Sequence, residues 1–371
     1  MKQNIIKNLS NIPGWRTKRK IIVIESDDWG SIRMPSLNVY STLLKRGLNL
    51  DGGDSERYNT KDNLASKCDL EGLFDVLLSV KDREGNSSKF TAISLVANPD
   101  FQKIKESDFQ NYYFEPLTTT LNRYGYEDSF SIWKKGLDEN VFIPEFHGRE
   151  HLNVMAWMRA LQANDKSTMM AFDQGVWGFK NQNKNGVSYQ AAFDLEYYSD
   201  LQVQTEIIES GLNIFEQLHG YKANFFVPPN GPFNNGLEEI AANNGIKFMS
   251  ASKIQKEVLG EGKFRKVFHY LGQKNRYNQK YITRNCFFEP SSEGKDWVDS
   301  CLRDIDIAFS WKKPAIISSH RVNYIGSLNE ENRSKGLRQL RELLNKITEK
   351  WPEVEFMTSS ELGELMQRKN D

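Results

Sequence analysis

The sequence predicts an α/β fold built on a mostly parallel sheet. Short runs rich in β-branched and aromatic residues alternate along the chain with segments whose apolar residues recur at helical spacing. Hydrophobic residues make up 39% of the chain and charged residues 26%, which argues against general disorder. The 371 residues exceed the usual domain size of roughly 100–200, yet α/β barrels of about 250 residues routinely fold as one unit. We therefore expect one domain, residues 1–371, with long loop insertions.

Each element has its own local signal. Helices are predicted over residues 69–81 and 337–347, and a last helix should begin at Thr358, because Glu361 completes a capping box. Two polar stretches, residues 46–67 and 175–189, are predicted as surface loops. With seven to nine strands, a closed barrel and an open doubly wound sheet both remain possible. The runs predicted as strands are residues 20–25, 90–97, 141–146, 169–172, 223–227, 246–249, 281–288, 314–318 and 354–357.

Charge and segment lengths set expectations about partners and location. Lys plus Arg equals Asp plus Glu, at 49 each, so no net field draws the chain toward nucleic acid or an anionic membrane. Aromatic residues, at 12%, slightly favour a carbohydrate partner, because flat rings stack on sugars. No apolar run has the length of a signal peptide or a transmembrane helix, so we expect a cytoplasmic location; the oligomeric state is not indicated.

The first candidate site is a pair of carboxylates, Asp27 and Asp28, directly after the first predicted strand. Strand carboxyl ends are where α/β folds build active sites. Two adjacent like charges need a cation, hydrogen bonds or a shared proton, although Asp is also common in turns and helix caps. Neighbouring residues of a regular strand point to opposite faces, so the strand must end before this pair if both serve one site.

The second candidate is a histidine pair, His147 and His151, four residues apart. A helix starting near Gly148 would bring both imidazoles together, where they could share one metal ion. The same letters fit the H-x-x-E-H signature of a zinc metalloprotease with Glu150 as base. That signature requires a helix, which Pro144 and Gly148 disfavour, so the protease ranks lower.

Two further segments end predicted strands. His320 closes the apolar run at residues 314–320, in register with the other strand-end residues, which favours a role in the site over a structural one. The loop that contains Asn230 follows another strand and is rich in Pro and Gly, as expected of a rigid wall beside a pocket or of a simple turn.

Taken in order, these segments resemble the motifs of the polysaccharide deacetylases, the carbohydrate esterase family that includes chitin and peptidoglycan deacetylases. The resemblance runs from Glu25 to about His320 and implies an irregular (β/α) barrel of about seven strands. It implies a divalent metal bound by Asp28, His147 and His151, with Zn²⁺ as the default because two histidines and a carboxylate suit it.

The same resemblance implies that Asp27 is the catalytic base and His320 the acid, although Ser318 replaces the leucine of the family's last motif. The implied reaction removes acetyl groups from an N- or O-acetylated sugar or polysaccharide. Trp29 and Trp177 are expected to stack on the sugar.

One departure from the family concerns an arginine that usually orients the base. Its motif corresponds here to Val227-Pro228-Pro229-Asn230-Gly231, which has no arginine. Arg149 or Arg284 could replace it, and the sequence leaves both open. Arg149 and Asn230 are also predicted to contact substrate.

Two other functions remain open. A glycoside hydrolase of the same barrel superfamily would need two carboxylates, for which Asp27 with Glu289 or Asp173 are candidates. A carbohydrate-binding relative could keep the metal and lack turnover.

Overall fold

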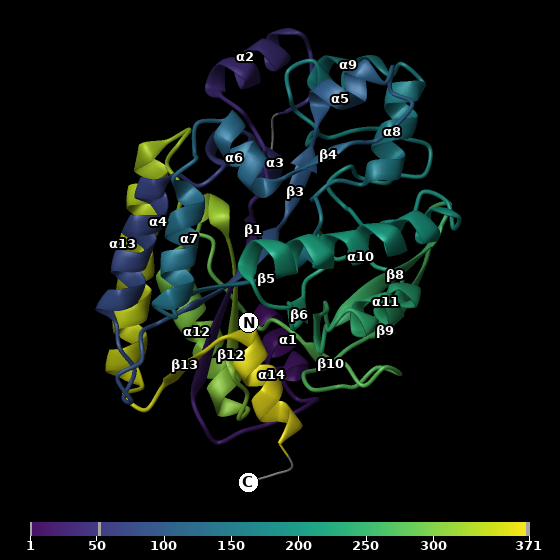
Figure 1. The fold of residues 1–371 in the computed structure, drawn as a ribbon. Coiled ribbons are helices and arrows are strands. Elements are labelled where there is room, and N and C mark those ends of the chain that lie inside the picture. Colours follow the sequence, from purple (N-terminus) through teal and green to yellow (C-terminus); the bar gives the residue numbers. More distant parts are fainter. Residues whose placement is uncertain (1, 51–52, 369–371) are drawn as a thin grey trace.

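The computed structural model describes residues 2–50 and 53–368. Its centre is a nine-stranded sheet in which every pairing is parallel, and helices surround this sheet (Figure 1). The strand order is β10-β7-β6-β5-β2-β1-β12-β11, with β13 beside β1. These strands are β1 (Ile21–Trp29), β2 (Phe90–Leu95), β5 (Phe142–Gly148), β6 (Phe225–Phe226), β7 (Phe248–Ser250), β10 (Lys280–Ile282), β11 (Cys286–Phe287), β12 (Ala315–His320) and β13 (Glu355–Met357).

The sheet closes through one segment of chain. Only three residues separate β10, which pairs with β7, from β11, which pairs with β12. The two outermost strands of the sheet are therefore consecutive parts of one extended segment. Counted this way, the ring has seven strand positions, and β13 extends it beside the start of β1. The predicted irregular (β/α) barrel of about seven strands is confirmed.

Most helices pack outside the barrel. In Figure 1, α4, α7 and α13 lie together along one side, and α10 crosses in front of β5. No described helix is both long and apolar enough to cross a membrane. The helices are α1 (Lys2–Ser10), α2 (Leu37–Lys45), α3 (Gly53–Lys61), α4 (Lys67–Ser79), α5 (Phe101–Glu106), α6 (Leu117–Arg123), α7 (Ser129–Asp138), α8 (Val154–Gln162), α9 (Lys166–Phe172), α10 (Asp200–His219), α11 (Glu238–Asn243), α12 (Trp297–Ser310), α13 (Glu330–Lys350) and α14 (Ser359–Gln367), with short 3₁₀ helices at Asn235–Leu237 and Arg321–Asn323.

Side-chain alternation along β1 decides which residues enter the barrel. Ile22 and Ile24 pack outward against the surrounding helices, whereas Ile21 and Val23 pack inward with residues of the other strands and of α14. Because the period of a strand is two, the inward set continues with Glu25 and Asp27. The barrel interior is thus apolar near the start of β1 and ionic near its end.

Two predicted elements differ from the structure. Residues 169–172, predicted as a strand, lie in α9, where Asp165 caps the helix by accepting a hydrogen bond from the Thr168 backbone. The predicted loop at residues 46–67 contains α3, although residues 51–52 lie outside the described part of the chain. The capping box at Thr358 and Glu361 is confirmed at the start of α14.

Two small antiparallel ribbons lie outside the barrel. The first pairs β3 (Ala97–Pro99) with β4 (Phe114–Pro116), and the second pairs β8 (Ile254–Gly260) with β9 (Lys263–Phe268). No strand was predicted in the residues of the second ribbon.

Candidate active site

A bulge in β1 brings both aspartates to the same site. β1 does not end before Asp27, as the sequence had led us to expect, but continues through Trp29. Its pairing with β2 shifts between Ser26 and Trp29, and Asp28 has a left-handed backbone with φ of 75°. This conformation is uncommon for a residue other than glycine, and bulges often re-aim a side chain next to an active site. The bulge therefore solves the geometric problem that adjacent strand residues face opposite ways.

Asp28 lies beside the two predicted histidines. Its Oδ1 is 3.4 Å from Nε2 of His147 and 3.1 Å from Nε2 of His151, and all three side chains are buried. One ligand atom from each residue lies within 4.8 Å of the others, which is the spacing of a metal site. Burial raises the pKa of Asp28, but the two histidines oppose this and hold that pKa well below its usual range.

The histidines do not reach this site on a helix. His147 is in β5, the strand ends at Gly148 with φ of 135°, and α8 begins only at Val154. The predicted helix near Gly148 is therefore wrong, and an irregular turn brings His151 back beside His147. Glycine suits this turn because a positive φ strains other residues.

A test of the metal site comes from the second ring nitrogen of His147. Its Nδ1 lies 2.6 Å from the carbonyl oxygen of Val227, which can only accept, so Nδ1 is the protonated nitrogen. Nε2 then carries a lone pair, and it is buried with no hydrogen-bond partner among the described residues. Metal-binding histidines commonly fix their tautomer in this way. The donors therefore fit a divalent cation.

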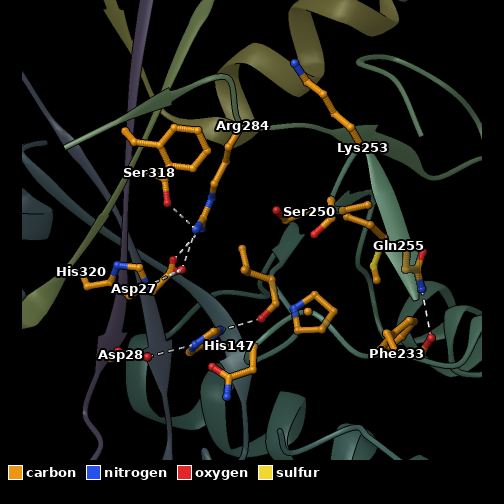
Figure 2. Close-up of a pocket in the computed structure, with 18 of the residues that line it drawn as sticks. Asp27, Asp28, His147, Phe233, Ser250, Lys253, Gln255, Arg284, Ser318 and His320 are labelled. Carbon is orange, nitrogen blue, oxygen red and sulfur yellow. Dashed lines mark hydrogen bonds and ion pairs between the residues drawn. The ribbon is translucent and has the colours of Figure 1, made fainter. Parts of the chain in front are cut away.

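Asp27, in contrast, is paired with a cationic side chain of the protein. Its two carboxylate oxygens each accept a hydrogen bond of 2.6 Å from Arg284 (Figure 2). Nε of Arg284 donates to Glu25 at 2.5 Å. Burial raises the pKa of Asp27, yet the charge and hydrogen bonds of Arg284 outweigh it and lower that pKa. Asp27 is thus held as an ionised, oriented carboxylate.

Of the two candidate arginines, Arg284 is the one that contacts Asp27. This residue lies in the three-residue gap between β10 and β11, and its NH1 also donates to Ser318 at 3.0 Å. Ser318, which stands where the resembling family has a leucine, thus accepts a hydrogen bond from Arg284. Arg149 instead forms a bidentate pair with Glu150.

His320 lies beside Asp27 on the neighbouring strand β12. The two residues are direct partners in the β1–β12 register, and Nε2 of His320 lies 3.8 Å from Oδ2 of Asp27. Nδ1 of His320 is 2.5 Å from Oε1 of Glu289. Burial lowers the pKa of His320, but Glu289 outweighs it and raises that pKa to about 9. His320 is therefore a protonated, oriented imidazolium at neutral pH.

These groups line one pocket of about 670 Å³. Its walls include both aspartates, both metal-site histidines, Arg284 and His320, and in Figure 2 it extends from them toward Phe233 and Gln255. A volume of this size accommodates a sugar-sized or larger ligand.

Of the residues predicted to bind substrate, one lines the pocket and the others are buried in the protein. Asn230 lines the pocket. Trp29 does not, because it packs in the core against Trp133 and Phe142 and donates to Ser26. Trp177 is also buried, where its ring stacks on His151 with 6.0 Å between centroids.

Arg149 is likewise not among the pocket-lining residues. It is buried, pairs with Glu150 and lies over the ring of Phe114. Asp173, a glycosidase candidate, is a half-exposed residue paired with Lys105.

Several site residues were missed by sequence reasoning. Glu25 had a signal, because it shares the inward parity of Asp27 within an apolar strand and a buried charge needs a partner. Arg33, which lines the pocket between the rings of Tyr58 and Trp177 and donates to Gln190, had none.

Comparison with known proteins supports the fold. No protein-family model matches the chain, and no curated protein is significantly similar to it. Among solved structures, a probable polysaccharide deacetylase from Pseudomonas aeruginosa PAO1 aligns with 95% of this chain and 92% of its own, at 10% identity and a TM-score of 0.50. A protein of Parabacteroides distasonis, named as a glycoside hydrolase/deacetylase, aligns with 97% of this chain and 74% of its own, at 9% identity and the same TM-score. At this identity the likeness concerns architecture alone, and the chain therefore shares the barrel fold of the polysaccharide deacetylases.

Proposed function

We propose that the protein is a metal-dependent deacetylase that hydrolyses the acetyl group of an N- or O-acetylated sugar or polysaccharide. The observation that carries the proposal is the juxtaposition in one pocket of a buried Asp28, His147 and His151 set with an oriented base and acid. Zn²⁺ is the first ion to test, because two histidines and one carboxylate suit it and leave coordination positions open. A bound ion would polarise the acyl carbonyl and acidify a water molecule.

Asp27 acts as the general base in this proposal. Arg284 keeps its carboxylate ionised and fixes its plane, so the free lone pairs are directed into the pocket. Proton removal from the attacking water by a positioned carboxylate typically contributes about 10²–10⁴ in rate.

His320 acts as the general acid. Glu289 holds Nδ1, which leaves the protonated Nε2 toward Asp27 and the pocket. From this place it can donate a proton to the departing amine or alcohol, so that acetate and a deacetylated sugar result. Glu289 is a positioning residue here, since it acts through His320.

The alternatives have weaker support. A glycosidase would need Glu289 as a free carboxylate in the pocket, but both of its oxygens are engaged, by His320 and by Arg57. A zinc metalloprotease would need Glu150 as the base, but that carboxylate is buried and paired with Arg149. A sugar-binding protein without turnover would have no need for an oriented acid and base.

Acetate release from a panel of N- and O-acetylated sugars, measured with protein loaded in turn with Zn²⁺ and other divalent ions, tests the proposal. We expect release that chelation abolishes and metal restores. Asp27→Asn is the matched control, because it keeps the metal ligands and removes the base. Elemental analysis that finds no bound metal, together with no acetate from any substrate, would refute it.

A further inference from the structure

Exposed apolar side chains gather in one part of the molecule. Of the fourteen large apolar residues that the described chain exposes, nine fall in two segments, residues 5–12 and residues 254–270. Single exposed apolar residues are common on soluble proteins, but a gathering of this kind marks an interaction surface. The nine are Ile5, Ile6, Leu9, Ile12, Ile254, Leu259, Phe264, Phe268 and Tyr270.

The ribbon of β8 and β9 presents part of this gathering on one face. Ile254 is paired with Phe268, and Lys256 with Lys266. Paired residues and residues two positions apart share one face of a ribbon, so these four side chains lie together on the outward face. Phe268 is 68% exposed. The opposite face of β8 is buried, where Gln255 and Glu257 contact the body of the protein.

The two lysines of this ribbon face are placed directly opposite each other. Like charges in that arrangement destabilise a sheet, and neither lysine forms an ion pair with a described residue. Lys256 instead lies over the ring of Phe264 at 5.1 Å from its centroid.

Helix α1 adjoins the base of the ribbon. Lys253, just before β8, donates to Ser10 at the end of α1, and Trp15 donates to the carbonyl of Leu271 after β9. The apolar residues Ile5, Ile6 and Leu9 are exposed, whereas Lys7 of the same helix turns toward the protein and pairs with Asp304. The helix thus exposes apolar side chains and engages a polar one inward, the reverse of a surface helix.

The charge around this surface indicates the kind of partner that it binds. Residues 2–20 contain six Lys or Arg and no Asp or Glu, although the whole chain is balanced at 49 of each sign. Lys7, Arg19 and Lys20 pair with Asp304, Glu355 and Glu353. The local excess of positive charge is therefore carried by Arg16 and Lys18, together with Lys256 and Lys266 of the ribbon. Apolar side chains interspersed with lysines are characteristic of protein surfaces that lie on anionic lipid.

We propose that α1 and the outward face of the β8–β9 ribbon form a docking surface for a membrane containing anionic lipid. Ile254, Phe264 and Phe268 enter the interfacial region, and Lys256 and Lys266 contact the headgroups. A symmetric contact with a second copy is disfavoured, because it would bring the same basic surface against itself. Lys7, Ser10 and Gln255, which belong to these elements, also line the pocket, so docking brings the pocket close to the lipid surface.

Co-sedimentation with vesicles tests this proposal without any need for catalysis. The full-length protein is mixed with vesicles of phosphatidylcholine alone and with vesicles that also contain phosphatidylglycerol. We expect binding to the anionic vesicles only. The double variant Lys256→Gln/Lys266→Gln should bind roughly 30-fold more weakly, at about fivefold per lysine. Lys134→Gln/Lys166→Gln, which removes the same charge from exposed positions on α7 and α9, should bind as the wild type does.

An apolar pair of variants completes the test. Ile254→Ser/Phe268→Ser should abolish binding, and Leu37→Ser/Tyr113→Ser, at comparably exposed positions elsewhere, should not. Circular dichroism verifies that each variant is folded. Absent binding, equal binding to both vesicle types, or equal losses in the control variants would overturn the proposal. Self-association that Ile254→Ser/Phe268→Ser abolishes, without vesicle binding, would assign the surface to a second copy instead.

Discussion

The two halves of the pocket are built on opposite principles. On one side, Asp28, His147 and His151 converge, and the buried Nε2 of His147 has no hydrogen-bond partner in the described chain. On the other side, Asp27 and His320 each have a dedicated charged partner of opposite sign. The first half is completed only by something that the protein must bind, whereas the second is complete in the chain itself.

This difference has an energetic consequence. Pairing in the second half compensates the cost of burying charges, so its geometry is fixed before substrate arrives. In the first half, the converging ligands favour a bound metal cation over a proton. Loss of a residue should therefore affect metal content in the first half, and rate, stability or pH dependence in the second.

The largest effect is expected from His151→Ala. Because it removes one of three ligands, metal affinity should fall by more than the roughly 10–100-fold that follows loss of a residue that only orients a ligand. Metal-dependent acetate release should disappear, and the protein should stay folded because catalytic metal sites contribute less to folding than structural ones. Inductively coupled plasma mass spectrometry of the dialysed protein measures the metal. Full occupancy in this variant would contradict the assignment of the ligands.

Asp27→Asn should affect the second half of the pocket and leave the metal content of the first half unchanged. It keeps the shape of the side chain and cannot accept a proton, so the rate should fall by about 10²–10⁴ while metal content stays at the wild-type level. Steady-state kinetics and elemental analysis on the same preparation provide both numbers. Loss of metal in Asp27→Asn, with metal and activity kept in Asp28→Asn, would show that the two roles are exchanged.

Arg284→Gln should chiefly affect stability. It leaves the carboxylates of Glu25 and Asp27 buried without their cation, and breaking a buried ion pair from one side costs about 3–5 kcal/mol. Urea denaturation measures the change. Adding Glu25→Gln to this variant removes one of the uncompensated charges, so the double variant should recover part of the loss. A double variant less stable than Arg284→Gln would mean that the arginine does not compensate Glu25.

The sequence predicted the three candidate metal ligands more completely than the residues that hold Asp27 and His320 in place. Asp28, His147 and His151 belong to motifs that are local in the chain. The contacts of Arg284 with Glu25 and of Glu289 with His320 join residues 259 and 31 positions apart, and no local pattern specifies them. Inward parity along β1 could have marked Glu25, but the position of Arg284 depends on how β10 and β11 close the barrel.

Errors in secondary structure had a similar cause. The run at residues 169–172 is apolar and too short for its period to distinguish strand from helix, and the cap at Asp165 decides for helix. The turn between His147 and His151 could not be predicted, because the spacing of four also suits a helix. The mostly parallel sheet was predictable, since alternation of strands and helices extends over the whole chain, whereas its closure into a barrel was implied only by the resemblance to the deacetylase family.

The smallest effect expected is a shift of the alkaline limb of the pH profile in Glu289→Gln. Burial lowers the pKa of His320 and Glu289 raises it to about 9, so His320 stays protonated, and able to act as acid, up to that pH. Without the negative charge of Glu289, the lowering by burial is opposed only by the smaller contributions of Asp27 and Asp28. We expect the limb to move to lower pH by about 1–3 units, the usual effect of one close opposite charge.

The same pair contributes to stability, and its sign follows from the raised pKa. The contribution is complete below the ordinary histidine pKa of 6.5 and is lost as pH rises through about 9. Glu289→Gln should therefore lose more stability relative to the wild type at pH 6 than at pH 10, where the loss of its pairing with Arg57 remains. Profiles of kcat/KM against pH measure the limb, and urea denaturation at the two pH values measures the pair. Glu353→Gln, a surface carboxylate paired with Lys20, is the control and should change neither. An unmoved limb in Glu289→Gln would mean that His320 is not the acid, and the second half of the pocket would then have to be assigned another role.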